Sequence, residues 1–529
     1  MRAETVAGFE SILSRGDGGG VQQSDGTLHD LALDQVFARL GDDAPRAVSA
    51  FGVLLKSAAD VEYRQAVFRG LEDARVRQVV EVFLEEAQTC MRRDEASAKA
   101  HSRFEPELWH LRAVVGYIGA VEAFAEGLAK ALPASGVVSQ GWERLVRHVG
   151  EYRASPLFGG LEKEALAIED EFAQLRYNAL IRGAKVTVAQ TDGEADLGAV
   201  VTHVFERFRQ GEVTDHRSTF REPGLDHVQG WILERGAQVH PGPFARLMRF
   251  AGNTRGYHDQ TLMRFVDEVR FYLAYLDHLI PMRQAGLSVC YPIVSEESKE
   301  FTVTEAWDLV LAPRLVKEQH PVVVTNDLTL TGTERIVVIS GPNQGGKTTM
   351  ARVFGQVHFL AALGCPVPGA QAQVFLCDQV LTVFEREEQL DTLEGRLGAE
   401  IARLHEVFAE ATARTVIVIN EAFASTALQD ARILTRDVLE RISELDAVAV
   451  CVTFIDELSR LNEKTVSMVS TVDPSDPAVR TFRVERRVAD GLAYARALAA
   501  KHELTSEQIL TRLETASAVA LPAAREVRG

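Results

Sequence analysis

The sequence predicts a multi-domain protein in which an all-α region is followed by a C-terminal α/β domain. Before about residue 300, apolar side chains recur at helical spacing, as in the stretch from Val61 to Phe83, which indicates amphipathic helices. After it, short β-branched runs at residues 335–340, 415–419 and 448–452 alternate with helical segments. Runs that are apolar throughout are typical of parallel strands buried on both faces of a sheet. The 529 residues also exceed what one hydrophobic core accommodates.

Composition and charge describe an ordinary globular chain. Hydrophobic residues make up 46% and charged residues 25% of the sequence. No apolar run approaches the ~18 residues of a membrane span, and the N-terminus lacks the apolar stretch of a signal peptide. The net charge of −18 disfavours a broadly basic surface but leaves a local basic face open. Five scattered cysteines without a C-x-x-C pair favour a reducing compartment, so a cytoplasmic protein without a membrane segment is expected.

A phosphate-binding motif follows the first of the apolar runs. The Walker A pattern is matched at every defined position by Gly341-Pro-Asn-Gln-Gly-Gly-Lys-Thr348, between a predicted strand and a predicted helix. Glycines let backbone N–H groups approach phosphate oxygens, while Lys347 would reach the β- and γ-phosphates and Thr348 would hold Mg²⁺. The alternative is a glycine-rich turn that matches by chance. The flanking strand and helix favour a site for ATP and Mg²⁺.

A second candidate lies at the end of the run at residues 415–419. Asn420 and Glu421 stand where a Walker B motif would place Asp-Glu, so Glu421 is the candidate to orient and deprotonate an attacking water. An acidic residue that merely caps a strand end is the alternative. The neutral amide of Asn420 would hold the water shell of Mg²⁺ less strongly than a carboxylate.

Several C-terminal segments resemble one family. Gly341-Pro-Asn-Gln-Gly-Gly-Lys-Thr-Thr349 is similar to the Gly-Pro-Asn-Met-Gly-Gly-Lys-Ser-Thr segment of the MutS family of DNA mismatch-repair ATPases. The segment Gly364-Cys-Pro-Val-Pro-Gly-Ala370 resembles its Gly-x-x-Val-Pro-Ala segment. Residues 420–430 align without a gap on its Asp-Glu-Ile-Gly-Arg-Gly-Thr-Ser-Thr-x-Asp stretch. Residues 452–458 resemble its Ala-Thr-His-x-x-Glu-Leu segment, and residues 323–328 resemble the segment that packs against the adenine.

The resemblance implies a P-loop ATPase domain of the ABC type that binds ATP and Mg²⁺. The nucleotide would contact one upstream residue and the loop: Asn326, Gly341, Pro342, Asn343, Gln344, Gly345, Gly346, Lys347, Thr348 and Thr349. Glu421 and Lys347 would be catalytic, and Mg²⁺ would be held by Thr348 and, through water, by Asn420. A loop that crosses the interface of a homodimer would contain Ser425, Thr426 and Asp430.

Four positions depart from the pattern of the family. Asn420 stands where the family has Asp, and Phe454 stands where it has His. Leu397, in the segment 394–400 that would reach the nucleotide of the partner subunit, replaces a Ser. Val323 replaces an aromatic residue that stacks on the base. Because the first three positions tune hydrolysis, we expect the hydrolysis of ATP to be slow.

The resemblance extends into the helical half. Residues 30–36 and 59–68 look like the start of the family's core and lever, and the helix ending near Ile280 looks like the lever returning to the ATPase. The expected domains are a flexible segment (1–27), a helical core and lever domain with a small β insertion near 182–191 (28–295), the P-loop ATPase domain (296–515) and a tail (516–529). We expect a shortened relative without the N-terminal mismatch-recognition domain. Phe83-Leu-Glu85 fits the family's Phe-x-Glu wedge, but its helical context predicts a core position.

Two functions from different classes remain open, with a third less favoured. One is an ATP-gated dimeric clamp that binds DNA in repair or recombination, with contacts from Arg144, Arg147, Arg176, Arg182 and Lys185, although a solvated charged face is the usual role of such residues. The other is an ATP-gated interaction or scaffold module with little or no hydrolysis and no direct DNA binding. A small-molecule kinase would need an acceptor site and lid from a half that predicts long helices.

Overall fold

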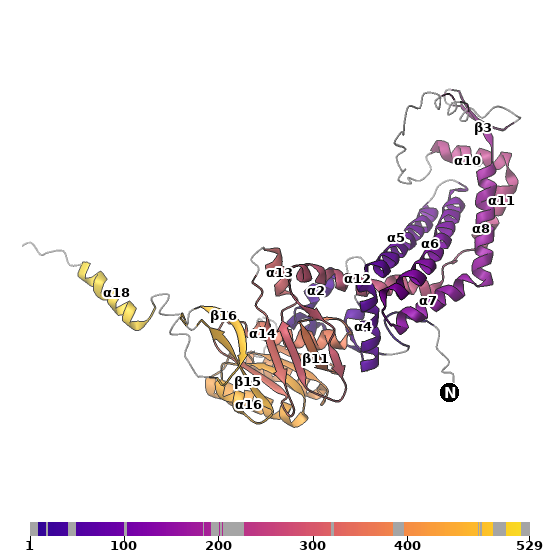
Figure 1. The fold of residues 1–529 in the computed structure, drawn as a ribbon. Coiled ribbons are helices and arrows are strands. Elements are labelled where there is room, and N and C mark those ends of the chain that lie inside the picture. The colour runs from indigo at the N-terminus through magenta and orange to yellow at the C-terminus, as the bar shows by residue number, and fades with distance from the viewer. Residues whose placement is uncertain are drawn as a thin grey trace, which may run out of the picture. The chain divides into compact units, whose positions relative to one another are not determined.

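The chain forms two compact units. The computed structural model describes residues 9–16, 19–40, 49–99, 103–182, 185–191, 200, 204, 227–318, 322–384, 396–473, 475–476, 479–489 and 504–519. A helical unit comprises Met1–Phe9, Gly70–Val138 and Trp142–Val266, and a C-terminal unit comprises Glu10–Arg69, Ser139–Gly141 and Asp267–Gly529. The helical N-terminal region and the C-terminal α/β domain that the sequence predicts are both present (Figure 1). This grouping places residues 10–69 and 267–295 with the C-terminal unit, and the domain borders at residues 27 and 295 stay a prediction.

The helical unit is built around a long antiparallel hairpin of α5 and α6. The Phe83 ring stacks on Phe124, with the ring centroids 4.1 Å apart. Gly127 allows close packing, since a Cβ there would lie 2.8 Å from the methyl carbons of Val79. Phe83 is thus a core residue, as its helical context predicts. The helices of this unit are α5 (Ala74–Lys99), α6 (Glu105–Ser135), α7 (Gln140–Arg153), α8 (Pro156–Gln174), α10 (His227–Val239) and α11 (Pro241–Asn253).

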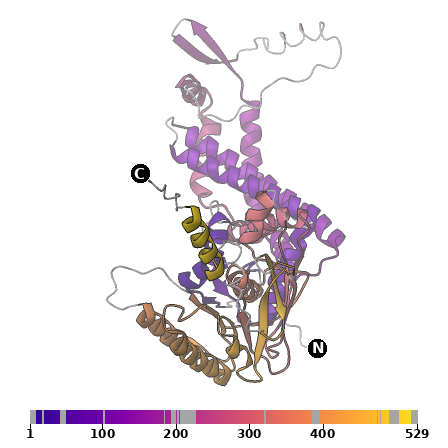
Figure 2. The same ribbon diagram turned by 90° about the vertical axis from the view of Figure 1, so that its left-hand side faces the viewer.

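A two-stranded hairpin lies where the small β insertion is expected. Strand β3 (Tyr177–Arg182) pairs antiparallel with β4 (Lys185–Gln190), and Arg182 is opposite Lys185 in the register. Figure 2 shows this hairpin from a second direction. Both basic side chains are exposed.

A six-stranded sheet organises the C-terminal unit. Its strand order is β12-β13-β14-β9-β15-β16, and every neighbouring pair is parallel except β15 with β16. Strands β9 (Ile336–Ser340), β13 (Val416–Asn420) and β14 (Val448–Val452) are buried at every position, which explains their continuous apolar runs. The remaining strands are β12 (Val380–Phe384), β15 (Thr465–Val472) and β16 (Arg480–Arg486).

Helices cover both faces of this sheet. Ile417 and Ile419 point to a core that also contains Leu404 of α15 (Arg396–Glu410) and Leu439 of α16 (Leu428–Leu445). The opposite face packs against α14 (Lys347–Ala362), of whose 16 residues 13 are buried, so α14 is a central helix. A second sheet, with the order β6-β11-β7-β8, contacts α14 through β11. Its strands are β6 (Ile293–Ser295), β7 (Phe301–Ala306), β8 (Asn326–Leu330) and β11 (Gln371–Phe375).

The edge strand β12 is covered by a segment from the start of the chain. Gln23 accepts a hydrogen bond from the Val380 N–H at 3.0 Å, and the Thr27 hydroxyl donates to the Val380 carbonyl at 3.1 Å. The Thr382 hydroxyl donates to Asp30 at 2.6 Å. Gln23 and Thr27 thus satisfy the two backbone groups of Val380 that an exposed edge would leave open. Part of the segment predicted to be flexible therefore forms β1 (Val21–Gln22) and begins α1 (Asp25–Asp30).

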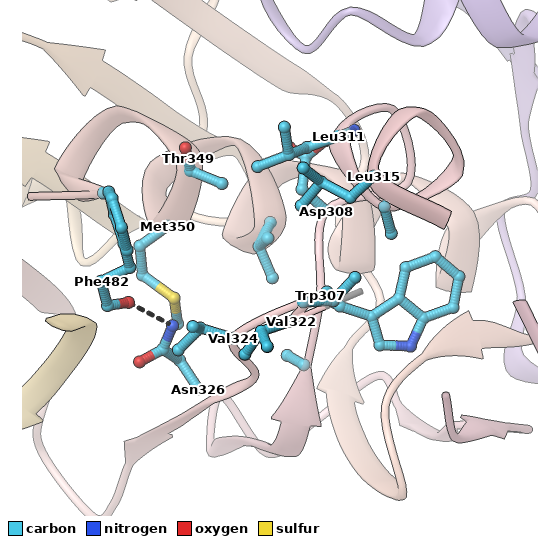
Figure 3. A pocket seen from close by; sticks show the side chains of 15 residues that line it. Trp307, Asp308, Leu311, Leu315, Val322, Val324, Asn326, Thr349, Met350 and Phe482 are labelled. Atoms are coloured by element: carbon cyan, nitrogen blue, oxygen red, sulfur yellow. Dashed lines mark hydrogen bonds between the residues drawn. The ribbon is translucent and has the colours of Figure 1, made fainter. Parts of the chain in front are cut away.

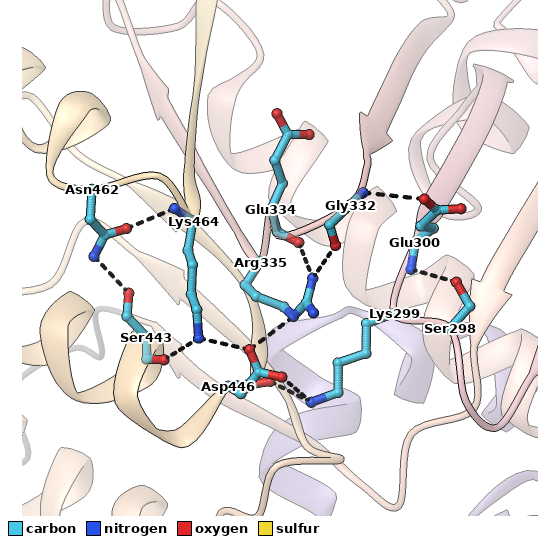
Figure 4. Close-up of polar contacts among 10 residues, drawn as sticks. All are labelled: Ser298, Lys299, Glu300, Gly332, Glu334, Arg335, Ser443, Asp446, Asn462 and Lys464. Atoms are coloured by element: carbon cyan, nitrogen blue, oxygen red, sulfur yellow. Dashed lines mark hydrogen bonds and ion pairs between the residues drawn. The ribbon is translucent and has the colours of Figure 1, made fainter.

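A charged cluster around Asp446 connects three segments of the chain to the C-terminal end of α16. Asp446 accepts hydrogen bonds from Lys299 at 2.8 Å, Lys464 at 2.8 Å and Arg335 at 3.1 Å (Figure 4). Burial opposes its ionisation, but the two lysine hydrogen bonds and the Arg335 charge prevail and hold its pKa at about 2. Asp446 ends α16 in a left-handed conformation with φ 59°, which Asn and Gly also tolerate.

The remaining elements complete the described part of the chain. They are α2 (Leu33–Leu40), β2 (Val53–Leu54), α4 (Ala58–Glu72), α12 (Gln260–Gln284), β5 (Val289–Cys290), α13 (Leu311–Lys317), β10 (Val367–Pro368), η1 (Asp456–Arg460) and α18 (Ser506–Val519). Within the described ranges no helix combines the length and apolarity needed to cross a membrane. All five cysteines are free thiols.

Candidate nucleotide site

The Walker A segment forms a tight loop between β9 and α14. Gly341 has φ +116° and Gly346 has φ +92°, conformations that glycine adopts at little cost. Ser470 of β15 packs against the loop: its hydroxyl donates to the Gly345 carbonyl at 2.7 Å. A Cβ at Gly341 would lie 2.7 Å from the Ser470 carbonyl oxygen, and one at Gly345 would collide with the Ser470 hydroxyl. Ser470 therefore disfavours a side chain at both Gly341 and Gly345, and the turn itself also favours glycine at Gly341.

Lys347 begins α14, and its side chain is only 3% exposed. Its Nζ donates to the carbonyl oxygens of Gly341 and Pro342, both at 3.1 Å, and to Asn343 Oδ1 at 3.3 Å. Glu421 Oε1 lies 3.6 Å from the same Nζ. Burial lowers the pKa of Lys347, and the Glu421 charge opposes that effect. The structure therefore brings the two residues predicted to be catalytic into one ion pair.

Glu421 sits in a bent loop directly after β13. It has φ 55° and Phe423 has φ 64°, which are uncommon values for residues other than glycine. Two hydrogen bonds hold this conformation: Glu421 N–H donates to the Val452 carbonyl at 3.0 Å, and Phe423 N–H donates to Glu400 Oε2 at 2.8 Å. Backbone outliers that the surroundings over-determine are common at functional sites. The bend turns the Glu421 side chain toward Lys347.

Asn420 is the last residue of β13 and is 8% exposed. Side chains alternate along a strand, so Asn420 shares the face of Val418, which packs on α14, while Ile419 faces the opposite core. Its Oδ1 is buried and has no hydrogen-bond partner among the described residues. A buried oxygen without a partner beside a candidate phosphate loop is an acceptor for the water molecules of a hydrated cation.

The other departures from the family pattern have structural roles. The Phe454 ring lies over Lys347, with Nζ 5.5 Å from the ring centroid, so it supplies a cation–π contact but no hydrogen-bond donor. Leu397 is partly buried and packs against the core between the sheet and α15. Glu394 and Gly395, which belong to the segment predicted to reach a partner subunit, lie outside the described residues.

An apolar cavity of about 300 Å³ adjoins the loop (Figure 3). Its walls come from the segment before β8, the start of α13, the first turns of α14 and the start of β16, and include Val323, Met350, Val353 and Phe482. Thr349 and Asn326, both predicted to contact nucleotide, line it too. Phe482 was missed by sequence reasoning, since no motif marks it and only the fold of β16 brings it here.

The remaining predicted site residues are partly exposed. Thr348 is half-buried at the start of α14, while Asn343 and Gln344 are exposed on the loop. Ser425 is exposed in the loop before α16, and Asp430 is exposed in the first turn of α16. Thr426 N–H donates to the Phe423 carbonyl at 3.3 Å. Among the basic residues considered for DNA, Arg144 and Arg147 lie on α7, and Arg176, Arg182 and Lys185 belong to the β3–β4 hairpin and its entry.

The architecture and the site can now be compared with known proteins. The chain is a multi-domain protein with a helical N-terminal region and a C-terminal α/β domain, and the family model described as MutS domain V matches residues 337–503. The DNA mismatch repair protein MutS of Shouchella clausii is 28% identical over 232 residues, which cover 40% of this chain and 26% of that protein. The endonuclease MutS2 of Gemmatimonas aurantiaca is 26% identical over 211 residues, covering 38% of this chain and 26% of that protein.

A further relative matches more of the chain. The DNA mismatch repair protein MutS of Bacillus cytotoxicus is 24% identical over 284 residues, covering 50% of this chain and 31% of that protein. The part of the chain that matches the MutS domain V model is thus similar to the corresponding part of MutS and MutS2 proteins. The matched region spans less than a third of the length of these relatives.

Proposed function

We propose that the C-terminal unit binds ATP with Mg²⁺ at the loop from Gly341 to Thr348 and hydrolyses it slowly with Glu421 as the base. One observation carries the proposal: a glycine loop between a buried strand and a central helix holds the Lys347 ammonium 3.6 Å from Glu421. A loop of this form presents backbone N–H groups and a helix N-terminus to an anion. The match of residues 337–503 to MutS domain V supports the same activity.

Lys347 would change partners when the nucleotide binds. Its present acceptors are two neutral carbonyls and one amide oxygen of its own loop. A phosphate oxygen carries negative charge, so it attracts the ammonium by a direct Coulomb interaction that neutral carbonyl and amide oxygens do not provide. Phosphate oxygens would therefore displace the loop carbonyls, and Lys347 would move away from Glu421. That movement would free the Glu421 carboxylate to accept a proton from water.

The residues present suit Mg²⁺. The Thr348 hydroxyl and the unpartnered Oδ1 of Asn420 are oxygen ligands of the kind that Mg²⁺ prefers, directly or through water. When bound, Mg²⁺ would neutralise charge on the phosphates. Asn420 lacks the charge of the usual carboxylate, and Phe454 offers no donor to a phosphate oxygen. Losing one such polar contact typically costs ~2–4 kcal/mol of transition-state stabilisation, or ~30- to 1000-fold in rate.

The test is calorimetric titration of the full chain with ATP and Mg²⁺, comparing the parent with Lys347→Ala. We expect binding to be lost or severely weakened in this variant, because its ammonium is the cation at the centre of the loop. Lys317→Ala removes an exposed lysine of α13 in the same unit and should leave the affinity unchanged. Circular dichroism of each variant checks that the fold is kept. Equal affinity for ATP in the parent and in Lys347→Ala would contradict the proposal.

For the whole protein, we propose a homodimeric DNA-binding clamp that acts in the cytoplasm in DNA repair or recombination. The exposed Ser425 and Asp430 support a subunit contact beside the site, and the exposed pair of Arg182 and Lys185 supports a contact with phosphates. Binding to duplex, branched and mismatched DNA, with and without ATP across a salt series, tests this function. Binding that is absent under every condition would contradict it.

Phe454 and Asn420 favour a second candidate, an ATP-gated interaction or scaffold module with little or no hydrolysis and no direct DNA binding. Both positions lack the polar group that would assist the reaction, while the loop that would bind nucleotide is intact. Measured turnover with and without DNA separates the two functions. The scaffold module predicts firm ATP binding, no turnover and no response to DNA.

A further inference from the structure

Phe482 occupies an unusual position beside the phosphate loop. It lies in β16, has φ 57° and leaves 51% of its surface exposed. A Cβ on Gly346 would lie 3.9 Å from the Phe482 Cβ, so the residue packs directly on the end of the loop. Its ring lines the apolar cavity together with Met350 of α14 and Val323. Figure 3 shows Phe482 and Trp307 on opposite sides of this cavity.

The backbone around Phe482 is held in place by Asn326. The Asn326 Nδ2 donates to the Phe482 carbonyl at 3.2 Å, and its Oδ1 accepts from the Val484 N–H at 2.7 Å. The Asn326 side-chain amide thus forms hydrogen bonds with the Phe482 carbonyl and with the Val484 N–H, two residues further along β16. A left-handed conformation is unfavourable for a residue with a side chain, and it persists only where the surroundings impose it. The clamp therefore keeps a half-exposed aromatic ring at the cavity.

The cavity is suited to a flat apolar ring. Its walls are mostly aliphatic, and Met350 adds a polarisable sulfur. The one carboxylate in the wall, Asp308, is 4% exposed and already accepts hydrogen bonds from Val310 N–H at 2.9 Å, Leu311 N–H at 2.7 Å and Gln356 at 3.3 Å. A ligand in this cavity would therefore be held by surface contact with its ring rather than by that carboxylate.

We propose that Phe482 stacks on the adenine ring of the bound nucleotide and takes the place of the aromatic residue that Val323 replaces. The inference rests on the proposed ATP site, because the phosphates must occupy the loop for the base to reach the cavity. Gly346 and Thr349 connect the phosphate loop with the cavity. Gly346 ends the loop and Thr349 lies in the first turn of α14, and both residues line the cavity. Asn326 acts as a positioning residue that holds Phe482 through its backbone.

The experiment compares ligands with and without a base. Affinities of the full chain are measured for ATP and, by competition with a fluorescent ATP analogue, for inorganic tripolyphosphate, both with Mg²⁺. Base–aromatic stacking predicts that Phe482→Ala weakens ATP binding by about 5- to 150-fold. Binding of tripolyphosphate should not change. Phe482→Tyr should keep the parental affinity for ATP. Val488→Ala, which alters another exposed apolar residue, should leave the affinities for both ligands unchanged.

Two further variants distinguish a loss of base stacking from a loss of folding stability. Phe482→Gly relieves the left-handed backbone, so it should be no less stable than the parent and yet bind ATP as weakly as Phe482→Ala. Val323→Phe in the Phe482→Ala background should recover part of the ATP affinity. Unchanged ATP binding in Phe482→Ala, or an equal loss for ATP and tripolyphosphate, would overturn the assignment. If the parent bound neither ligand, the ATP site itself would be wrong, which is a different result.

Discussion

Replacing Asp446 with Asn tests how the charged cluster at the end of α16 stabilises the C-terminal unit. Asn has the same shape and tolerates the left-handed φ of 59° at this position, so the change removes charge with little effect on the backbone. The three cations around it are Lys299, Arg335 and Lys464. Lys299 and Arg335 are 13% and 15% exposed, so the variant leaves two largely buried cations without their carboxylate.

The lowered pKa of Asp446 sets the size of the expected loss of folding stability. A carboxyl whose pKa falls from 3.8 to about 2 on folding contributes at most about 2.5 kcal/mol at neutral pH. The side chain is 37% exposed, and solvent screening reduces this contribution to about 1 kcal/mol. For a unit of this size, we therefore expect the thermal unfolding midpoint of the C-terminal unit to fall by roughly 2–4 °C at pH 7.

Thermal unfolding of the full chain at several pH values is the assay. Because folding depresses the pKa of Asp446, its contribution is complete above about pH 4 and is lost as the pH falls from there toward about 2. The difference between the parent and Asp446→Asn should therefore narrow from pH 7 to pH 3. Glu444→Gln, which removes an exposed charge from the same helix, is the matched control and should shift the midpoint little. A difference that is absent at pH 7, or that is as large at pH 3, would refute the reasoning.

Three other predictions concern the proposed function. Glu421→Gln should lower the rate of ATP hydrolysis with binding kept, and Asn420→Asp should raise that rate if the missing charge limits it; a Gln variant as fast as the parent would place the base elsewhere. Light scattering at micromolar concentration should show a dimer that ATP tightens, whereas a monomer with and without nucleotide would count decisively against the subunit contact. The double variant Arg182→Ala/Lys185→Ala should reduce the slope of log affinity for DNA against log salt by roughly 2, since each lost phosphate contact removes about 0.9. Arg92→Ala, an exposed position of the same unit, should leave that slope unchanged.

Local sequence was sufficient for the strands and loops that build the candidate site. A strand buried on both faces needs a continuous apolar run, so β9, β13 and β14 could be placed from composition alone. The Gly341–Thr348 pattern encodes a turn whose backbone few other sequences adopt. Because parallel strands end at the same edge of a sheet, a residue just after β13 was expected near that loop. The 3.6 Å pair of Lys347 and Glu421 agrees with this expectation.

The tertiary structure decided which distant residues complete these elements. Ser470 presses on the glycine loop, and Gln23 and Thr27 cover the edge of β12, although neither contact leaves a periodic signal in the sequence. Phe482 reaches the cavity because Asn326, more than 150 residues away in the chain, holds its backbone in a left-handed conformation. Periodicity and motifs report short-range backbone preference and burial. Contacts of this kind depend on how separate elements pack, and only the folded chain determines that packing.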